Sequence, residues 1–366
     1  MNNWLLKLPL LCLKHDNLTC MEDILQEKKE FATDSILEPE SIEDIIYSLM
    51  VNPNLSTINY FNDFSESGIS PESVNDVDND EIGVFDVDSS GNMQAMCTHA
   101  FHRHLQENPK KSAEILISRA TRKMLCMGLR PVAVSALLYH INFADPKGQL
   151  IASGAKKGLE NAAKKFGLSI SDRKIRFDLF PGSGQLPPAL IISMVGTVGQ
   201  KNKLITSSFK SKGGNLFLIG RLTNDISSSE YVEFYHEVQN TPLPLFNIED
   251  EIKIHELLEG LHERNLLQSA TPVGKGGLFF TLLRSAIPSG LGFDITTDDE
   301  HRIDAFLFGE SMGRILVEVA PGSEDEFVDF MTDAKFPFIG LGHITRGEIR
   351  IDEKSLGFID KMTRDS

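Results

Sequence analysis

A glycine-rich turn in front of an apolar run is the part of this sequence most suited to phosphate chemistry. The stretch reads Val-Gly-Lys-Gly-Gly-Leu-Phe-Phe from Val273 to Phe280, and its apolar end predicts a helix. Helix N-termini offer free N–H groups and the positive end of the helix dipole, so they attract phosphate. The candidate nucleotide-binding residues here are Lys275, Gly276 and Gly277.

Two other segments carry side chains of metal-binding types. Residues 86–97 begin like a calcium loop, but the twelfth position, which needs a bidentate glutamate, is Cys97. His99 and His102 are three residues apart, and no carboxylate or cysteine nearby completes a site. We interpret the first segment as an acidic loop and the histidines at 99–104 as surface residues, and we predict no metal site.

Common nucleotide and nucleophile fingerprints are missing from the sequence. It contains neither a GxxxxGK[ST] phosphate loop nor a GxGxxG dinucleotide motif. It also lacks the G-x-S-x-G elbow of α/β-hydrolases. These absences give a hydrolase or a dinucleotide-binding fold little support.

The elements that must position the candidate residues alternate along the chain. Ser41 is a plausible N-cap for a short helix, and strand and helix patterns alternate regularly from Ile82 on. Strands are predicted at 81–87, 130–139, 187–198, 215–220, 313–319 and 336–345, and helices at 112–129, 150–168, 250–268 and 323–334. A polar hinge at 199–214 separates two groups, of which the second alternates as in α/β layered domains.

The length of 366 residues exceeds what one core usually supports. We therefore predict a lead-in at 1–40, an N-terminal domain at 41–205 and a C-terminal domain at 206–366. No apolar run is long enough for a membrane span, and Trp4 to Leu13 reads as a docked segment, because Lys7 and Pro9 interrupt it. The four scattered cysteines fit a reducing cytoplasm.

The net charge of −16 is concentrated in one region. Between Lys29 and Arg103 there is no Lys or Arg, while fifteen Asp and Glu residues occur. A surface this acidic repels phosphate backbones, so we predict that the chain does not bind nucleic acid.

Read in order, the motifs resemble the aminoimidazole ribonucleotide synthetase-like superfamily, and within it the formylglycinamidine ribonucleotide synthase family. The Lys-Gly-Gly stretch is similar to the family's Ala-His-Asp-x-Ser-Asp-Gly-Gly-Leu motif, and residues 307–319 to its Phe-Ser-Glu-Ser-x-x-Arg strand. Residues 227–232 resemble its Gly-Ser-Glu-Tyr turn, and 119–131 its Glu-Ala-x-Arg-Asn helix. Residues 49–64 are similar to the segment that leads into the second half of the long, two-half enzyme.

This resemblance implies a two-domain unit of mixed class. It consists of an α+β N-terminal domain, which pairs with another such domain into a barrel, and an α/β layered C-terminal domain. The family's members are ATP-dependent C–N ligases of purine synthesis, so the resemblance implies ATP or ADP and Mg²⁺ as cofactors. The implied partner is a catalytic synthetase-like half, or a second copy through the N-terminal domain.

The departures from the family's motifs all weaken a magnesium nucleotide site. Where the family has Glu and Asn in the motif helix, this chain has Arg119 and Lys123, and the family's Asp before Asn-Phe becomes Tyr139. The His, Asp, Ser and Asp of the glycine-rich motif become Thr271, Pro272, Gly274 and Lys275. Because Mg²⁺ prefers oxygen ligands, these changes disfavour metal-assisted phosphoryl transfer. Basic side chains still offer a metal-free grip on phosphate, and the candidates are Lys275, Arg173, Lys174 and Arg314, with Asn142 kept from the family's Asn-Phe motif.

Three hypotheses follow from the sequence. The first is a degenerate, non-catalytic half that acts as a scaffold for a catalytic half; in it, Arg314 is a structural partner of Glu310. The second is an independent superfamily enzyme with a rearranged site at Asn142, Asp178, Lys275 and Glu310. The third is a non-enzymatic binding protein that uses its acidic segment to hold a basic partner.

Overall fold

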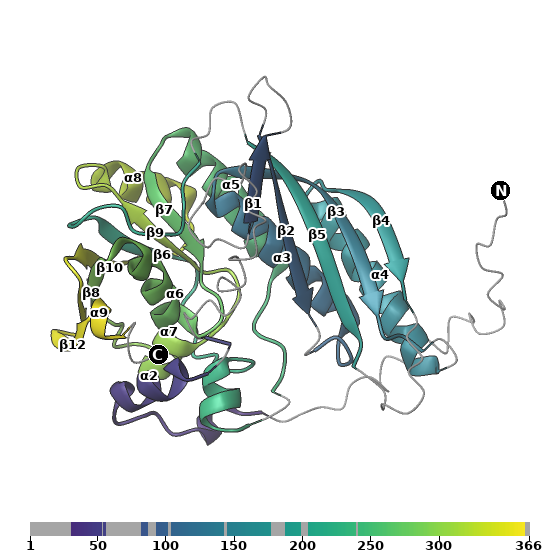
Figure 1. Cartoon of the computed structure of the whole chain (residues 1–366), viewed down its shortest axis with the longest axis horizontal. Helices are drawn as coiled ribbons and strands as arrows, with labels where there is room; N and C mark the ends of the chain where they lie inside the picture. The colour runs from purple at the N-terminus through teal and green to yellow at the C-terminus, as the bar shows by residue number, and fades with distance from the viewer. Residues whose placement is uncertain are drawn as a thin grey trace, which may run out of the picture.

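The computed structural model describes residues 31–52, 54–55, 82–86, 93–101, 104–142, 145–176, 187–198, 204–238 and 241–362. The segment 1–30, the acidic stretch 64–81 and residues 87–92 of the calcium-like loop lie outside these residues. Two sheets with helices on their faces form two units, which stand side by side (Figure 1). Within the described ranges, no helix is long and apolar enough to cross a membrane.

The first unit is a five-stranded sheet with the order β1-β2-β5-β3-β4. Its strands are β1 (Ile82–Asp86), β2 (Met93–Phe101), β3 (Leu129–Tyr139), β4 (Ser169–Ile175) and β5 (Ala189–Val198). All neighbours are antiparallel except β3 and β4, which are parallel. Helices α3 (Pro109–Cys126) and α4 (Pro146–Lys165) cover one face, and their apolar residues form one core cluster with that face (Figure 1).

Both helices of the first unit start at strong N-terminal signals. The side chain of Asn108 accepts a hydrogen bond from the Lys111 amide at 3.0 Å, and Asp145 accepts one from the Lys147 amide at 3.0 Å. A proline follows each cap, where its missing N–H costs nothing. The two helices touch closely at Gly158, because a Cβ there would lie 2.1 Å from the carbonyl oxygen of Lys110.

The second unit is a seven-stranded sheet with the order β12-β11-β8-β10-β6-β9-β7. Its strands are β6 (Asn215–Ile219), β7 (Leu267–Pro272), β8 (Gly292–Ile295), β9 (Ile315–Val319), β10 (Phe338–Thr345), β11 (Glu348–Ile351) and β12 (Lys354–Phe358). Its helices include α5 (Ile248–Glu263), α6 (Gly277–Ala286), α7 (Ile303–Phe308), α8 (Glu324–Ala334) and α9 (Ile359–Met362). Among these strands only β8 and β11 pair in parallel, so the sheet is mainly antiparallel. The predicted layers of helices packed on a sheet are confirmed.

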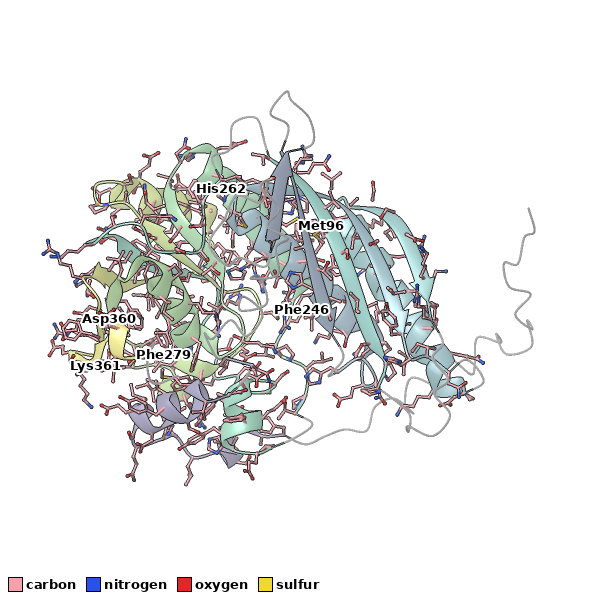
Figure 2. All side chains as sticks on the ribbon, viewed as in Figure 1. Met96, Phe246, His262, Phe279, Asp360 and Lys361 are labelled. Atoms are coloured by element: carbon pink, nitrogen blue, oxygen red, sulfur yellow. The ribbon has the colours of Figure 1, made fainter. Side chains whose placement is uncertain are left out.

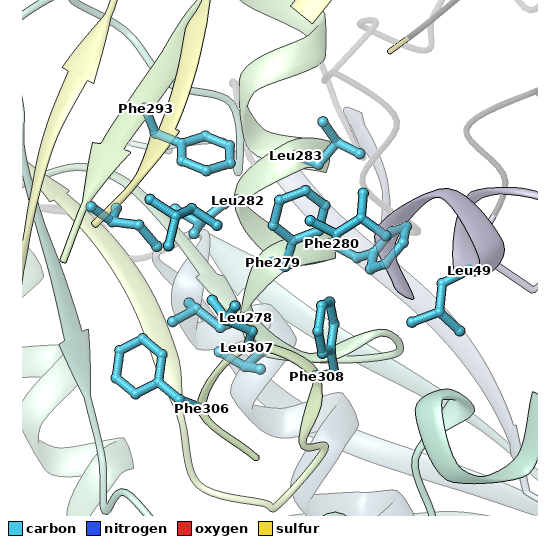
Figure 3. Packing of buried hydrophobic residues seen from close by; sticks show 14 of the residues in the cluster. Leu49, Leu278, Phe279, Phe280, Leu282, Leu283, Phe293, Phe306, Leu307 and Phe308 are labelled. Carbon is cyan, nitrogen blue, oxygen red and sulfur yellow. The ribbon is translucent and has the colours of Figure 1, made fainter. Parts of the chain in front are cut away.

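Strand β6 shows how this sheet separates two cores. Leu216 and Leu218 point into the cluster that holds α6 and α7, whereas Phe217 and Ile219 point into the cluster that holds α5 and α8. This is the two-residue alternation of a strand buried on both faces. Phenylalanines of α6 and α7 fill much of the first cluster (Figure 3).

Helix α2 (Ile42–Met50) packs against the second unit. It begins after Ser41 as predicted, although the Ser41 side chain makes no capping hydrogen bond. Ile45, Ile46 and Leu49 are buried in the core cluster of α6 and α7, and Figure 3 shows Leu49 beside that cluster. The domain boundaries stay a prediction, but α2 contributes its apolar face to the C-terminal half of the chain.

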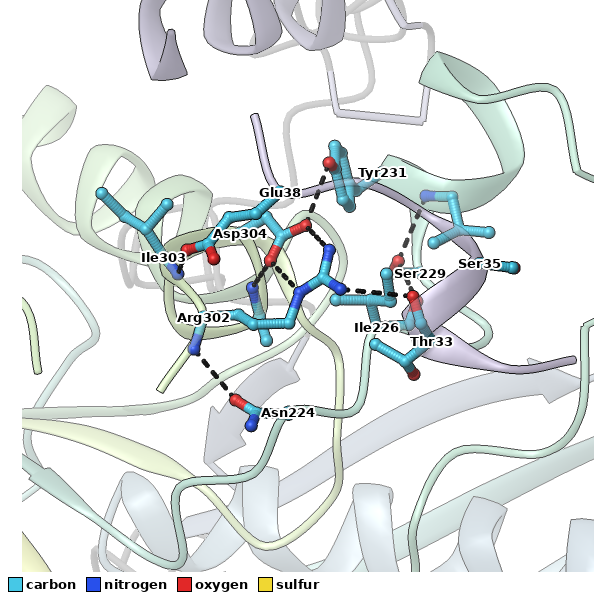
Figure 4. Close-up of polar contacts among 12 residues, drawn as sticks. Thr33, Ser35, Glu38, Asn224, Ile226, Ser229, Tyr231, Arg302, Ile303 and Asp304 are labelled. Carbon is cyan, nitrogen blue, oxygen red and sulfur yellow. Dashed lines mark hydrogen bonds and ion pairs between the residues drawn. The ribbon is translucent and has the colours of Figure 1, made fainter. Parts of the chain in front are cut away.

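A buried ion pair anchors the chain just before α2 (Figure 4). Asp304 is fully buried and accepts two hydrogen bonds from the Arg302 guanidinium, at 3.0 and 2.7 Å, and one from the Tyr231 hydroxyl, at 3.1 Å. Arg302 also donates to the Thr33 carbonyl at 3.2 Å, and the Ile303 amide donates to Glu38 at 2.8 Å. Burial, followed by the charge of Asp304, raises the pKa of Tyr231, which stays a hydrogen-bond donor.

Replacing Asp304 by alanine leaves a guanidinium and a phenol in the interior without their acceptor. We expect Asp304→Ala to lower the free energy of unfolding by about 3–5 kcal/mol, measured by urea denaturation. The matched control is Asp172→Ala, which breaks an ion pair with Lys174 on the surface, where both side chains are more than half exposed. We expect no measurable change in the control, and equal losses for the two variants would contradict the structural role of Asp304.

Candidate functional site

The glycine-rich turn leads into α6 through two left-handed residues. Gly276 has φ 78° and Gly277 has φ 71°, a region that side-chain-bearing residues avoid. A Cβ on Gly276 would lie 2.8 Å from the Phe280 ring, and one on Gly277 would lie 2.6 Å from the backbone of Leu307 and Phe308. The predicted helix start is confirmed, and both glycines are needed for its shape.

The amides of this turn already have partners within the chain. Gly276 N–H donates to the Glu310 Oε1 at 2.9 Å, and Gly277 N–H donates to the carbonyl of Gly274 at 3.0 Å. The amide of Glu230 donates to the same Glu310 oxygen at 2.8 Å. The anion at the start of α6 is therefore the chain's own carboxylate.

Glu310 is buried, with 7% of its surface exposed. Burial raises the pKa of its carboxyl, while the two backbone N–H groups from Glu230 and Gly276 act in the opposite direction. The neighbouring charge of Glu230 raises the pKa further, and the charge of Arg119 lowers it. Two buried carboxylates thus lie next to each other, with cationic side chains around them.

Glu230 is held by amide side chains from the segment that follows α2. It is 2% exposed, and its Oε2 accepts hydrogen bonds from Asn52 Nδ2 at 2.9 Å and from Asn54 Nδ2 at 3.2 Å. The Lys275 Nζ lies 3.8 Å from Glu230 Oε1, and the Lys275 side chain is 56% exposed. Lys275 therefore balances a buried carboxylate from the solvent side of the turn.

Arg314 lies deeper in the same region. Arg314 is 1% exposed, and its Nη2 donates to the Gly309 carbonyl. The backbone carbonyl of Arg314 accepts a hydrogen bond from the Val273 N–H at 2.9 Å. Burial lowers the pKa of the Arg314 guanidinium to about 10, and the charges of Asp225 and Glu310 oppose that decrease. No ion pair joins Arg314 to Glu310 among the residues that the structure describes, so their coupling acts over a longer distance.

Helix α3 connects the first unit to this region. Arg122 forms a buried ion pair with Glu251 of α5, and Arg119 Nε donates to the Met312 sulfur at 3.3 Å. Arg119 occupies the position of the family's glutamate, and its charge reaches Glu310. A cationic side chain from α3 thus acts on the buried carboxyl of Glu310.

The other candidate residues lie elsewhere. Asn142 lines a cavity of about 260 Å³ together with His140 and Asp145. Arg173 and Lys174 lie on the edge strand β4, at the far side of the first unit from α6 (Figure 1), in exposed ion pairs with Glu160 and Asp172. The structure thus brings together Lys275, Gly276, Gly277 and Arg314. Arg173 and Lys174 of β4 do not lie with them. Asp178 lies outside the described residues.

The expectation that His104 is a surface residue is wrong. Its imidazole is 1% exposed, and Nε2 lies 2.7 Å from the Ser228 hydroxyl of the second unit. Ser228 has φ 59°, at the position of the glycine in the family's Gly-Ser-Glu-Tyr turn. The sequence showed three clustered histidines but not the long-range partner that buries one of them.

Comparison with known proteins defines the relationship. The family model for the AIR synthase related protein N-terminal domain matches residues 79–198, and that for the C-terminal domain matches residues 211–352. The chain belongs to the AIR synthase-related family. The predicted resemblance is confirmed, with both matched domains in the expected order.

Curated relatives of the chain include phosphoribosylformylglycinamidine synthase subunits. PurL of Alkaliphilus metalliredigens is 23% identical over 347 residues, which cover 93% of this chain and 47% of that protein. PurL of a Parafrankia species is 28% identical over 272 residues, covering 74% and 35% respectively. The chain thus spans about half or less of the length of these relatives.

A solved structure agrees on the fold. The structure of T. maritima PurL complexed with FGAR has a TM-score of 0.68 at 13% identity, over 89% of this chain and 54% of that one. At this identity the likeness establishes the two-domain arrangement. The chemistry must be argued from this chain's own residues.

The glycine-rich turn gives a direct test of its packing. We expect Gly277→Ala to lower the free energy of unfolding by at least about 3 kcal/mol, since the backbone strain of an alanine there adds to a clash with the chain near Leu307. Gly290→Ala is the matched control, because Gly290 has φ 63° and no atom within 4 Å of its Cβ position. The control should lose only about 1 kcal/mol in urea denaturation. Similar losses in both variants would refute the tight-packing explanation.

Proposed function

We propose that this chain is a degenerate, non-catalytic half of a formylglycinamidine ribonucleotide synthase-like ligase of purine biosynthesis, and that it acts as a scaffold for a catalytic half. The observation that carries the proposal is the Glu310 carboxylate on the Gly276 amide at the start of α6. The relationship to PurL subunits and the share of their length that the chain covers also support it. On this proposal the two domains are residues 41–205 and 206–366.

The surroundings of the turn do not fit a magnesium nucleotide. A phosphate at the start of α6 would have to displace Glu310 from two backbone N–H groups and would then lie beside two buried carboxylates. Repulsion between the phosphate and these carboxylates opposes that exchange. Arg119 and Lys275 supply positive charge where the family supplies oxygen ligands for a metal.

The proposal predicts that the isolated chain does not bind Mg·ATP. Isothermal titration at millimolar nucleotide should give only the heat of dilution, and Lys275→Ala should give the same trace. Saturable heat that Lys275→Ala abolishes would show a nucleotide at this turn and would contradict the proposal. A second titration without Mg²⁺ tests whether the Lys275 side chain binds phosphate in the absence of a metal.

The partner surface that we propose is the sheet face of the first unit that α3 and α4 leave uncovered. On that face Met96 is 47% exposed and Val132 is 42% exposed, and Met96 pairs across the strands with Val195 (Figure 2). Apolar side chains exposed on an open sheet face favour burial against another sheet. The occupant would be the corresponding face of a catalytic half or of a second copy.

A charge on this face should prevent pairing without unfolding the chain. We expect Val132→Glu to abolish co-purification with a catalytic PurL-type half and to remove self-association in sedimentation velocity. The control is Lys156→Glu, a charge change on the exposed side of α4. Undiminished pairing by Val132→Glu, or equal loss in the control, would count against this surface.

A further inference from the structure

Two short helices that contact each other in the second unit both expose apolar side chains. Tyr47 and Val51 of the α2 region are 55% and 65% exposed, and Phe234 and Tyr235 of η4 (Tyr231–Tyr235) are 39% and 37% exposed. The two helices are in contact, and Figure 1 shows α2 beside the helix that follows residue 230. We call these four residues the α2–η4 patch.

The patch lies opposite the buried side of the same helices. Ile45, Ile46 and Leu49 of α2 are at most 1% exposed, whereas Tyr47 and Val51, four residues apart, share the outward side. A helix with a single core would carry polar residues there. Exposed aromatic and aliphatic side chains on two helices in contact are typical of a surface that binds another segment.

Carboxylates surround the patch. Glu43, Asp44 and Glu237 are exposed beside it, and the part of the chain that contains α2 carries no Lys or Arg between Lys29 and Arg103. An occupant that complements this surface carries apolar anchors together with positive charge. An acidic partner would instead be repelled.

We propose that residues 4–14 of the same chain, Trp-Leu-Leu-Lys-Leu-Pro-Leu-Leu-Cys-Leu-Lys, cover the α2–η4 patch. The segment combines a tryptophan and six leucines with Lys7 and Lys14, and the first acidic residue follows only at Asp16. It matches the patch in both hydrophobicity and charge. This inference is independent of the proposed ligase role.

The attachment of the segment makes the contact sterically accessible. The described chain begins at Phe31, which packs against the same core cluster that buries α2. Residues 15–30 can span at most roughly 55 Å when extended, so the segment is long enough to reach the outer side of the helix whose buried side shares a core cluster with Phe31. Tethering raises the local concentration to about the millimolar range, which favours the chain's own segment over a free competitor.

The tryptophan content of the chain supplies the probe. Trp4 is the only tryptophan in the sequence, so the fluorescence of the full chain reports on this segment alone. We expect a blue-shifted emission maximum and weak quenching by acrylamide, both independent of protein concentration. Val51→Asp/Phe234→Asp should shift the emission to that of indole in water and raise the quenching constant several-fold.

The control for these measurements is Phe358→Asp, which charges a 52% exposed phenylalanine on β12, outside the patch. It should leave the Trp4 signal unchanged, and circular dichroism should show folded chains in all variants. If the patch variant unfolds, deletion of residues 1–14 gives a second measurement: binding of an apolar dye should rise several-fold when the patch is uncovered. Solvent-like Trp4 emission in the unmodified chain, insensitivity to the patch variant, or protection that appears only at high concentration would each overturn the proposal.

Discussion

The carboxylate of Glu310 fixes the arrangement of the candidate site. One of its oxygens accepts hydrogen bonds from the backbone amides of both Glu230 and Gly276. These bonds connect the turn before η4 to the turn before α6. Both turns would otherwise present unpaired N–H groups in the interior, which is costly. The turn that leads into α6 contains the positive φ angles of Gly276 and Gly277, and Gly277 lies against the backbone of Leu307 and Phe308 in α7.

Placing one buried carboxylate requires a set of compensating groups. The amides of Asn52 and Asn54, the amine of Lys275 and the charges of Arg119 and Arg314 all bear on the pair Glu230 and Glu310. They come from the segment that follows α2, from α3 of the first unit and from the second unit. Buried charges are tolerated only when they are paired and hydrogen-bonded, so the junction between the units depends on all three segments.

Much of the fold could be predicted from the sequence because its signals are local. The amphipathic pattern identified α3 and α4, although both helices begin a few residues earlier than predicted, at Pro109 and Pro146. The apolar run after Gly277 identified α6. β4 was missed because none of its residues is buried and five of its seven residues are polar, which is typical of a loop or an edge strand. The antiparallel pairing of the second sheet was also beyond reach, because register depends on partners distant in sequence.

The site was only partly predictable for the same reason. Lys275 and the two glycines follow from a local pattern, but the Asn52–Glu230 hydrogen bond joins residues 178 positions apart, and His104 meets Ser228 across 124 positions. The Arg122–Glu251 pair likewise spans two units. Such contacts are set by tertiary packing, and a single sequence contains no direct signal for them.

The most direct measurement is a crystal structure of the chain grown with Mg·ATP in excess. If Glu310 has taken the place of a phosphate at the start of α6, it keeps its hydrogen bond from the Gly276 amide, and the turn at Lys275 holds neither nucleotide nor metal. An ordered divalent ion with a triphosphate on the Gly276 and Gly277 amides, and Glu310 displaced from them, would contradict a non-catalytic role for this turn.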